Sequence, residues 1–102
     1  MLEDKKGEDI LLMDIQNLAS FADYFVLCSG TSDRMLQALA DGVSEDVKKQ
    51  FGILSQPEGQ PIDGWLVVHL GDVVVHLFSP EQREYYDLEK LWDQAKVLLR
   101  LQ

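Results

Sequence analysis

The order of hydrophobic and polar positions predicts two strands, a helix, a strand hairpin and a second helix. Short apolar runs at residues 9–15 (DILLMDI) and 24–28 (YFVLC) have the length and composition of strands. A helix over residues 32–51 is predicted, because Thr31 or Ser32 offers an N-cap and Gly52 offers a stop. Its apolar residues recur at helical spacing and form one stripe that faces a core: Leu36, Leu39, Ala40, Val43, Val47 and Phe51.

The clearest local signal is a predicted hairpin of strands 64–70 and 73–78. The two apolar runs flank Gly71-Asp72, the chemistry of a two-residue turn, and that turn sets the register. One face is then aliphatic, with Leu70 opposite Val73, and we expect it to pack under the helices. On the other face the turn places three pairs opposite each other: Trp65 with Phe78, Val67 with His76 and His69 with Val74. Because it mixes aromatic and polar groups, we expect this second face to be a contact surface.

The pattern after the hairpin predicts a long last helix over residues 80–100. Ser79 is a suitable N-cap, Pro80 suits the first helical position, and Gln82 follows three residues after the cap. The residues at helical spacing form a predicted buried stripe: Tyr85, Leu88, Leu91, Trp92, Ala95 and Leu99. Tyr86 falls off that stripe, so we expect it to be partly exposed. The fold class is therefore α/β with a mixed sheet, in which the crossover helix allows the second and third strands to be parallel.

Size and charge narrow the range of partners. The chain has 102 residues, enough for one domain, and 18 acidic against 9 basic residues leave a net charge of −9. An acidic protein whose cations are spread along the chain is repelled by nucleic acid and favours a basic protein partner. The single cysteine excludes an internal disulfide and a cysteine-based zinc site. No apolar run has the length of a membrane span, and no basic, Ser-rich leader is present, so we expect a cytoplasmic protein.

Two sequence patterns raise the possibility of enzymatic catalysis or metal binding. Cys28 and Arg34 have the Cys-x5-Arg spacing of tyrosine phosphatases, in which a loop and an arginine hold phosphate while the cysteine attacks it. Met35 and Asp33 depart from that pattern, and a small, half-buried cysteine at a strand end is the more common case. His69 and His76 occupy diagonal positions that suit a two-ligand metal clip, although two neutral histidines on a sheet face are more common.

A Gly-Thr-Ser stretch after the second strand resembles the glycine- and serine-containing loop of nucleotidyltransferases. Those enzymes hold metal ions with paired carboxylates on the following strand, and neither hairpin strand carries such a pair. We therefore expect a nucleotidyltransferase-like shape without the catalytic carboxylates. An acidic stretch on the last helix is either a solvated face or a surface for a basic partner: Glu81, Glu84, Asp87, Glu89 and Asp93.

Three separated blocks resemble the ribosomal silencing factor family, also called RsfS, Iojap or YbeB. The blocks are residues 23–34 (DYFVLCSGTSDR), residues 71–76 (GDVVVH) and residues 84–92 (EYYDLEKLW), with Trp65 between the first two. The resemblance covers about residues 6–92, and we expect residues 1–102 to form one domain of this family. Two departures are Met35, where the family usually has His, and an N-terminus of about eight residues where the family has a longer helix.

The resemblance implies a non-enzymatic function without a cofactor or a bound metal. Members of the family bind a large-subunit ribosomal protein, number fourteen, on the face that meets the small subunit, and tend to form homodimers. By occupying that face they hinder subunit joining and lower translation when nutrients are scarce. We expect this protein to act in the same way, by occupancy rather than by contact with nucleic acid or a membrane.

The side chains expected to contact the ribosomal protein are aromatic, apolar or acidic, as basic partners favour. They are Trp65, Leu70, Tyr86 and Glu89, with Asp72 and Asp87 adding steering charge. Leu70 also belongs to the aliphatic face of the hairpin, from whose tip it reaches the partner. Two other readings remain open: a hydrolase that uses Cys28 and Arg34, and a dimeric adaptor for another basic protein.

Overall fold

The structure, a computed structural model, describes Leu2 and residues 5–101 and confirms an α/β domain with a mixed sheet. Four strands and the first helix lie within one residue of their predicted bounds. The elements are β1 (Glu8–Asp14), β2 (Tyr24–Ser29), α1 (Asp33–Phe51), the short 3-10 helix η1 (Pro61–Asp63), β3 (Trp65–Leu70), β4 (Val73–Phe78), α2 (Pro80–Tyr86), α3 (Leu88–Leu91) and β5 (Lys96–Leu101).

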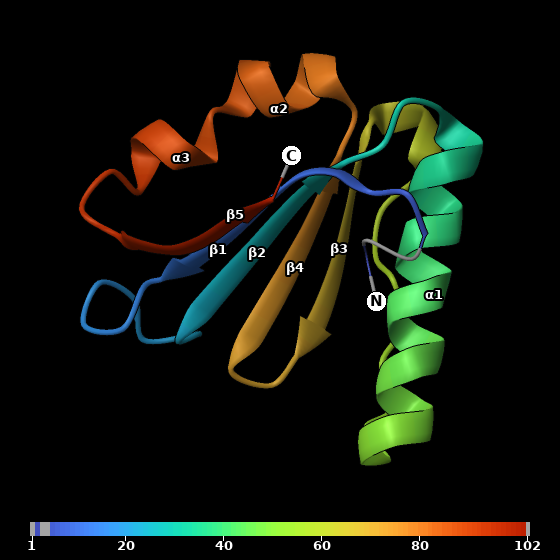
Figure 1. The fold of residues 1–102 in the computed structure, drawn as a ribbon, viewed down its shortest axis with the longest axis horizontal. Helices are drawn as coiled ribbons and strands as arrows, with labels where there is room; N and C mark the ends of the chain where they lie inside the picture. Colours follow the sequence, from blue (N-terminus) through green and yellow to red (C-terminus); the bar gives the residue numbers. More distant parts are fainter. Residues whose placement is uncertain (1, 3–4, 102) are drawn as a thin grey trace.

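In the described residues the strands form one five-stranded sheet in the order β3-β4-β2-β1-β5 (Figure 1). The hairpin register is confirmed, with Leu70 opposite Val73 and Trp65 opposite Phe78. The sheet is mixed, but the predicted parallel pair is wrong, because β2 pairs in parallel with β4 and not with β3. The crossover through α1 first enters the edge strand β3, and the tight turn then returns β4 to the side of β2.

Local capping signals explain where α1 begins and ends. Ser32 is the N-cap, and its hydroxyl accepts a hydrogen bond of 3.0 Å from the Met35 backbone N–H. Gly52 ends the helix in the left-handed region at a φ of 69°, which glycine adopts without steric cost. Among the described residues, no helix combines the length and apolarity needed to cross a lipid bilayer.

The predicted single helix over residues 80–100 is wrong. Ser79 and Pro80 do begin a helix, but α2 ends at Tyr86, because Asp87 takes a left-handed conformation with a φ of 48°. A short α3 follows, and residues 96–101 are extended as β5 along the free edge of β1, with Leu12 opposite Leu99. The predicted buried stripe is correspondingly wrong for Tyr85, Leu91 and Leu99, which are exposed.

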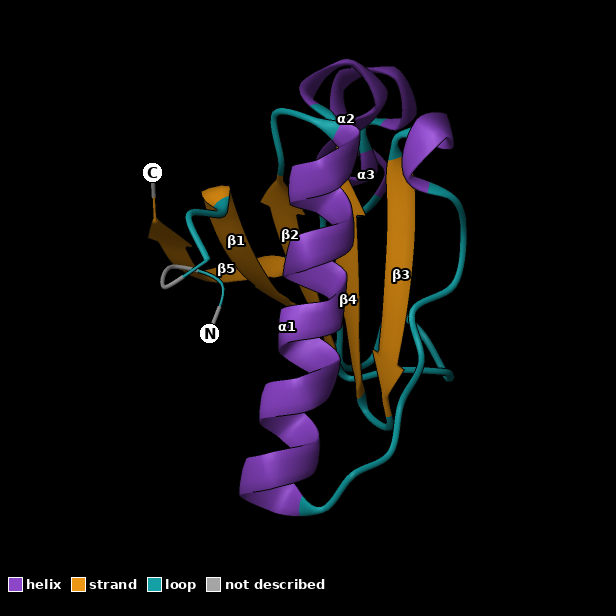
Figure 2. Cartoon of the chain, turned by 90° about the vertical axis from the view of Figure 1, so that its right-hand side faces the viewer, coloured by secondary structure: helices purple, strands orange, loops and turns teal. Residues whose placement is uncertain are grey.

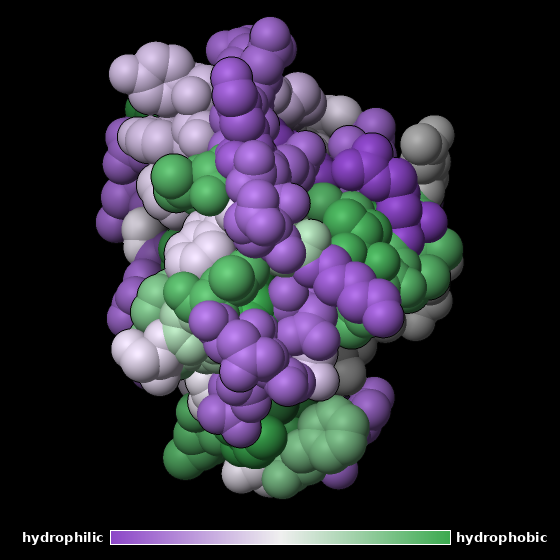
Figure 3. All heavy atoms as spheres, turned by 90° about the vertical axis from the view of Figure 1, so that its left-hand side faces the viewer, coloured by the Kyte–Doolittle hydropathy of each residue, from purple (hydrophilic) through white to green (hydrophobic). Residues whose placement is uncertain are grey.

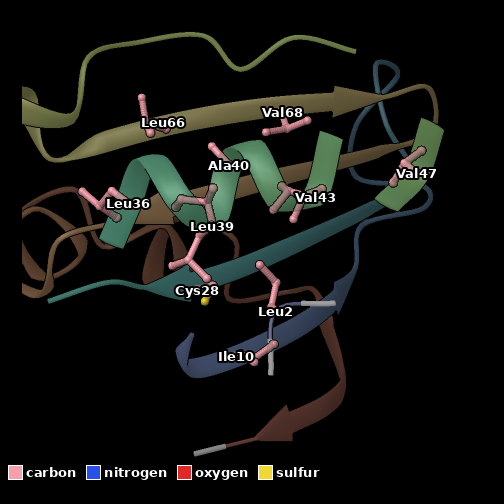
Figure 4. Packing of buried hydrophobic residues seen from close by; sticks show 12 residues of the cluster. Leu2, Ile10, Cys28, Leu36, Leu39, Ala40, Val43, Val47, Leu66 and Val68 are labelled. Atoms are coloured by element: carbon pink, nitrogen blue, oxygen red, sulfur yellow. The ribbon is translucent and has the colours of Figure 1, made fainter. Parts of the chain in front are cut away.

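The first hydrophobic core lies between α1 and one face of the sheet. Figure 2 shows α1 lying across this face, and Figure 4 shows Leu36, Leu39 and Val43 among the side chains of the strands. The aliphatic side of the hairpin, with Leu66 and Val68, packs here as predicted. Phe51 does not, because it lies in the last turn of α1 beyond the strands and is 65% exposed.

A second core covers the opposite face, which corrects the expectation of an open contact surface there. Phe78, Val74 and His76 are buried on it. They pack with side chains of β1 and β2, with Leu88 of α3 and with the connection between β1 and β2. Of the six hairpin residues on this face, only Trp65, Val67 and His69, all on edge strand β3, keep part of their surface in solvent.

Candidate functional site

Trp65 is held in place by aromatic neighbours at the start of β3. Its indole stacks on Phe78 with ring centroids 4.9 Å apart and lies 4.6 Å from the Tyr86 ring. The indole Nε1–H donates a hydrogen bond of 3.2 Å to Nδ1 of His76. A half-buried tryptophan with fixed orientation is the kind of anchor that carries much of the binding energy at protein interfaces.

The break between α2 and α3 brings Tyr86, Asp87 and Glu89 to the same end of the sheet as Trp65. Tyr86 is 45% exposed, in agreement with the prediction that it lies off the buried stripe. The left-handed Asp87 turns the chain directly after Tyr86, and Glu89 lies in the first turn of α3. The structure therefore groups four of the six predicted contact residues, two aromatic and two acidic.

Leu70 and Asp72 lie apart from that group, at the other end of the hairpin. Five residues of extended chain separate Trp65 from Leu70, which is about 17 Å. Leu70 also points to the opposite face, where it lines an apolar groove of about 540 Å³ beside α1. The carbonyl of Asp72 accepts the backbone N–H groups of Asp23 and Tyr24 at 2.8 and 3.1 Å, which ties the hairpin turn to β2.

Arg83 organises the α2–α3 segment, and the sequence pattern did not single it out. The side chain is 7% exposed, and its Nη1 donates to the Asp9 carbonyl at 2.6 Å and to Ser29 Oγ at 2.9 Å. Its Nε donates to Glu89 Oε1 at 2.8 Å. One buried guanidinium thus connects β1, β2 and α3. Its partners lie up to 74 positions away along the chain, so no helical or strand periodicity marks it.

A polar recess of about 330 Å³ adjoins Arg83, and carboxylates dominate its lining. Asp9, Glu84, Asp87 and Glu89 contribute to it. Glu89 and Asp9 are engaged by Arg83, at 2.8 and 3.6 Å respectively, while Glu84 and Asp87 add negative charge at the rim. The face formed by α2 and α3 is therefore acidic, with its one buried cation already paired.

His76 is neutral in the folded protein. Burial, with a smaller contribution from the nearby His69, lowers its pKa from 6.5 to about 4. Its Nδ1 must be unprotonated to accept the Trp65 N–H. His69 instead lies on the exposed edge, 3.7 Å from Glu58. The two histidines have different partners, and the described residues hold no group of three or more side chains that suits a metal ion.

Acid should destabilise the fold through His76. Between pH 6.5 and about 4 the unfolded chain binds a proton at this histidine and the folded chain does not, so stability is complete above pH 6.5 and is lost as pH falls towards 4. We expect a loss of roughly 2–3 kcal/mol between pH 7.5 and 4.5 from this group. The free energy of unfolding in urea should be measured at both pH values for the unmodified protein and for His76→Gln. Because the variant keeps every carboxylate, the difference between the two proteins isolates the contribution of His76. An equal loss in both proteins would contradict the assignment.

The environment of Cys28 does not favour a nucleophile. The thiol is fully buried in the first core, with Gly7 packed directly over its sulfur. Burial raises its pKa from 9.0 to about 11, although Arg83 opposes the shift. Arg34 lies on the exposed first turn of α1. A phosphatase of the Cys-x5-Arg type needs a thiolate at neutral pH, and this site supplies a buried thiol.

Comparison with known proteins gives the family. A family profile described as "Ribosomal silencing factor during starvation" matches residues 1–101. The chain belongs to the ribosomal silencing factor family. Among curated members, a ribosomal silencing factor of Bacillus subtilis is 42% identical over 95 residues, which cover 93% of this chain and 80% of that protein.

The similar proteins also include one with a solved structure and one from mouse whose name refers to mitochondria. A crystal structure of a protein from Chromobacterium violaceum superposes with a TM-score of 0.84 at 40% identity, covering 90% of this chain and 77% of that one. A mouse protein named "Mitochondrial assembly of ribosomal large subunit protein 1" is 38% identical over 96 residues, which cover 90% of this chain and 42% of the mouse protein. The fold described above is therefore that of the ribosomal silencing factors.

Proposed function

We propose that this protein binds the large-subunit ribosomal protein number fourteen and thereby prevents the two ribosomal subunits from joining. The bound protein occupies the face of the large subunit that the small subunit must contact, so translation falls when nutrients are scarce. The mechanism is steric: no bond is made or broken, and the effect follows the concentration of the protein relative to free large subunits.

The observation that carries this proposal is the grouping of Trp65 and Tyr86 beside Asp87 and Glu89. A ribosomal protein is basic, and a partner of that kind is attracted by acidic side chains and anchored by aromatic ones. The whole chain carries a net charge of −9, which opposes direct binding to RNA phosphates. An acidic protein can therefore bind the ribosome if its contact is a basic ribosomal protein and not ribosomal RNA.

Family membership supports the same partner. The name of the mouse relative refers to the large ribosomal subunit, and the profile that matches this chain is described as a silencing factor. Leu70 and Asp72, which lie at the far end of the hairpin, fit a second, peripheral part of the contact. A homodimer and a cytoplasmic location stay predictions of the family resemblance.

Co-sedimentation tests the proposed function. We expect the purified protein to travel with isolated large subunits in a sucrose gradient, and to reduce the amount of joined particle when small subunits are added. The effect should saturate at about one protein per large subunit. Recovery of the protein only at the top of the gradient, even at low salt, would overturn the proposal.

A further inference from the structure

An aromatic groove lies on the sheet face opposite α1, between β3, β4, α3 and the connection from β1 to β2. It has a volume of about 280 Å³, and its lining includes Phe21, Phe25, Trp65, His76 and Trp92. Figure 1 shows α3 and the β1–β2 connection on the left-hand side of the fold, and Figure 3 shows apolar patches among polar side chains on that side. Two segments distant in the sequence thus form its walls.

The rings of the groove are ordered by edge-to-face contacts. Trp92 lies 5.4 Å from Phe25 at 87° and 6.2 Å from Phe21 at 71°. Phe25 in turn meets His76 at 4.7 Å and 81°. Phe21 is 60% exposed, so its ring remains accessible to a ligand. Aromatic faces carry negative electrostatic potential, which attracts a cation placed over them.

The lining of the groove is almost entirely aromatic or aliphatic, with one carboxylate beside its rim. None of its lining residues is a lysine or an arginine. His69 on the rim contacts Glu58 at 3.7 Å. Nε2 of His76 is buried from solvent and therefore out of reach of a ligand. A cation entering the groove meets aromatic rings, with Glu58 near the rim and no lysine or arginine in the lining.

We propose that this groove receives an arginine side chain of the basic protein partner and holds it by cation–π contact with Phe21 and Trp92. The inference rests on the proposed function and states which chemistry recognises the partner. A guanidinium suits the groove because it is planar, stacks on aromatic rings and is more weakly hydrated than an ammonium. A purely apolar side chain would fill the space without the cation–π attraction.

Variants of Phe21 test the role of the aromatic face in large-subunit binding. Phe21→Leu keeps an apolar side chain but removes the ring, and we expect about fivefold weaker binding. Phe21→Trp keeps the ring and should bind within twofold of the unmodified protein. Phe51→Leu is the matched control, since Phe51 is 65% exposed on the other face of the sheet. Unchanged binding by Phe21→Leu, or equal loss in both Phe21 variants, would overturn the proposal.

A small-molecule probe separates failure of this inference from failure of the proposed function. We would titrate the full chain with N-acetyl-arginine methylamide and, in parallel, with its neutral citrulline counterpart at millimolar concentration. The indole N–H resonances of Trp65 and Trp92 are the readout. We expect the Trp92 resonance to shift with the arginine probe and not with the citrulline probe, even if large subunits do not bind. Equal shifts, or none, would contradict the cation–π assignment.

Discussion

Trp65→Ala should weaken binding to large subunits by at least about 30-fold while the domain remains folded. A central tryptophan at an interface contributes 2 kcal/mol or more on truncation, which corresponds to about this factor. The indole here is only half-buried, resting on Phe78 and Tyr86, so its loss should cost a smaller part of the stability than a core truncation would. Gradient binding and a thermal melt measure the two effects separately.

Two further variants identify the cause of any loss at Trp65. Leu54→Ala removes a large side chain that is 78% exposed on the loop after α1, and it should bind normally. Tyr86→Ala removes the exposed neighbour of Trp65 with little effect on the core and should weaken binding in the same direction. If Trp65→Ala binds as the unmodified protein does, Trp65 lies outside the interface, whatever the behaviour of the other variants.

Arg83→Met should destabilise the fold by about 3 kcal/mol. The guanidinium makes hydrogen bonds to Asp9, Ser29 and Glu89, and bonds of a charged donor contribute roughly 1.5–3 kcal/mol each. Part of the free energy lost with these hydrogen bonds is recovered through hydration. The Glu89 and Asp9 side chains are 33% and 45% exposed and bind water when the arginine is removed. Urea denaturation with linear extrapolation measures the change.

Matched substitutions show whether this effect belongs to the buried network. Arg34→Met removes an exposed arginine from the first turn of α1 and should change stability by no more than about 0.5 kcal/mol. Arg83→Lys keeps the charge but lacks the planar fork that reaches three partners, so it should recover only a fraction of the loss. A cost as small as that of Arg34→Met would show that the Arg83 contacts do not stabilise the fold.

Arg83 also links stability to the proposed interface. Its bond to Glu89 fixes α3, and the chain between them contains Tyr86 and Asp87. Loss of the guanidinium should therefore loosen the acidic and aromatic residues together and weaken large-subunit binding, even at temperatures at which Arg83→Met is fully folded. Amide hydrogen exchange in α2 and α3 should rise before exchange in the central strands.

Features that depend on neighbours along the chain were predictable from the sequence. The Ser32 and Ser79 caps, the Gly52 stop and the Gly71-Asp72 turn each act within a few residues. A two-residue turn also determines every cross-strand pair of its hairpin, which is why the neighbours of Trp65 and Leu70 were correct. The family blocks are local in the same sense, because each is a continuous run of residues.

The C-terminal segment shows how tertiary structure overrides a local preference. Residues 93–100 include good helix formers at helical spacing, and the sequence alone favours a continuous helix. The free edge of β1 offers unpaired backbone groups, and pairing with β5 satisfies them. The left-handed Asp87 and the buried Arg83 turn the chain towards that edge.

Local sequence patterns were sufficient to predict the α/β class, four strands with the hairpin register, the first helix with its caps, and the resemblance to the ribosomal silencing factors. The folded structure was needed to show which strand lies parallel to β2, that the second sheet face is a core, and that Arg83 is buried. It was likewise needed to show that Phe21 and Trp92 share one groove. The physical reason is the range of the interactions: caps and turns are made between near neighbours, whereas sheet order, burial and clustered charges depend on segments that meet only after folding.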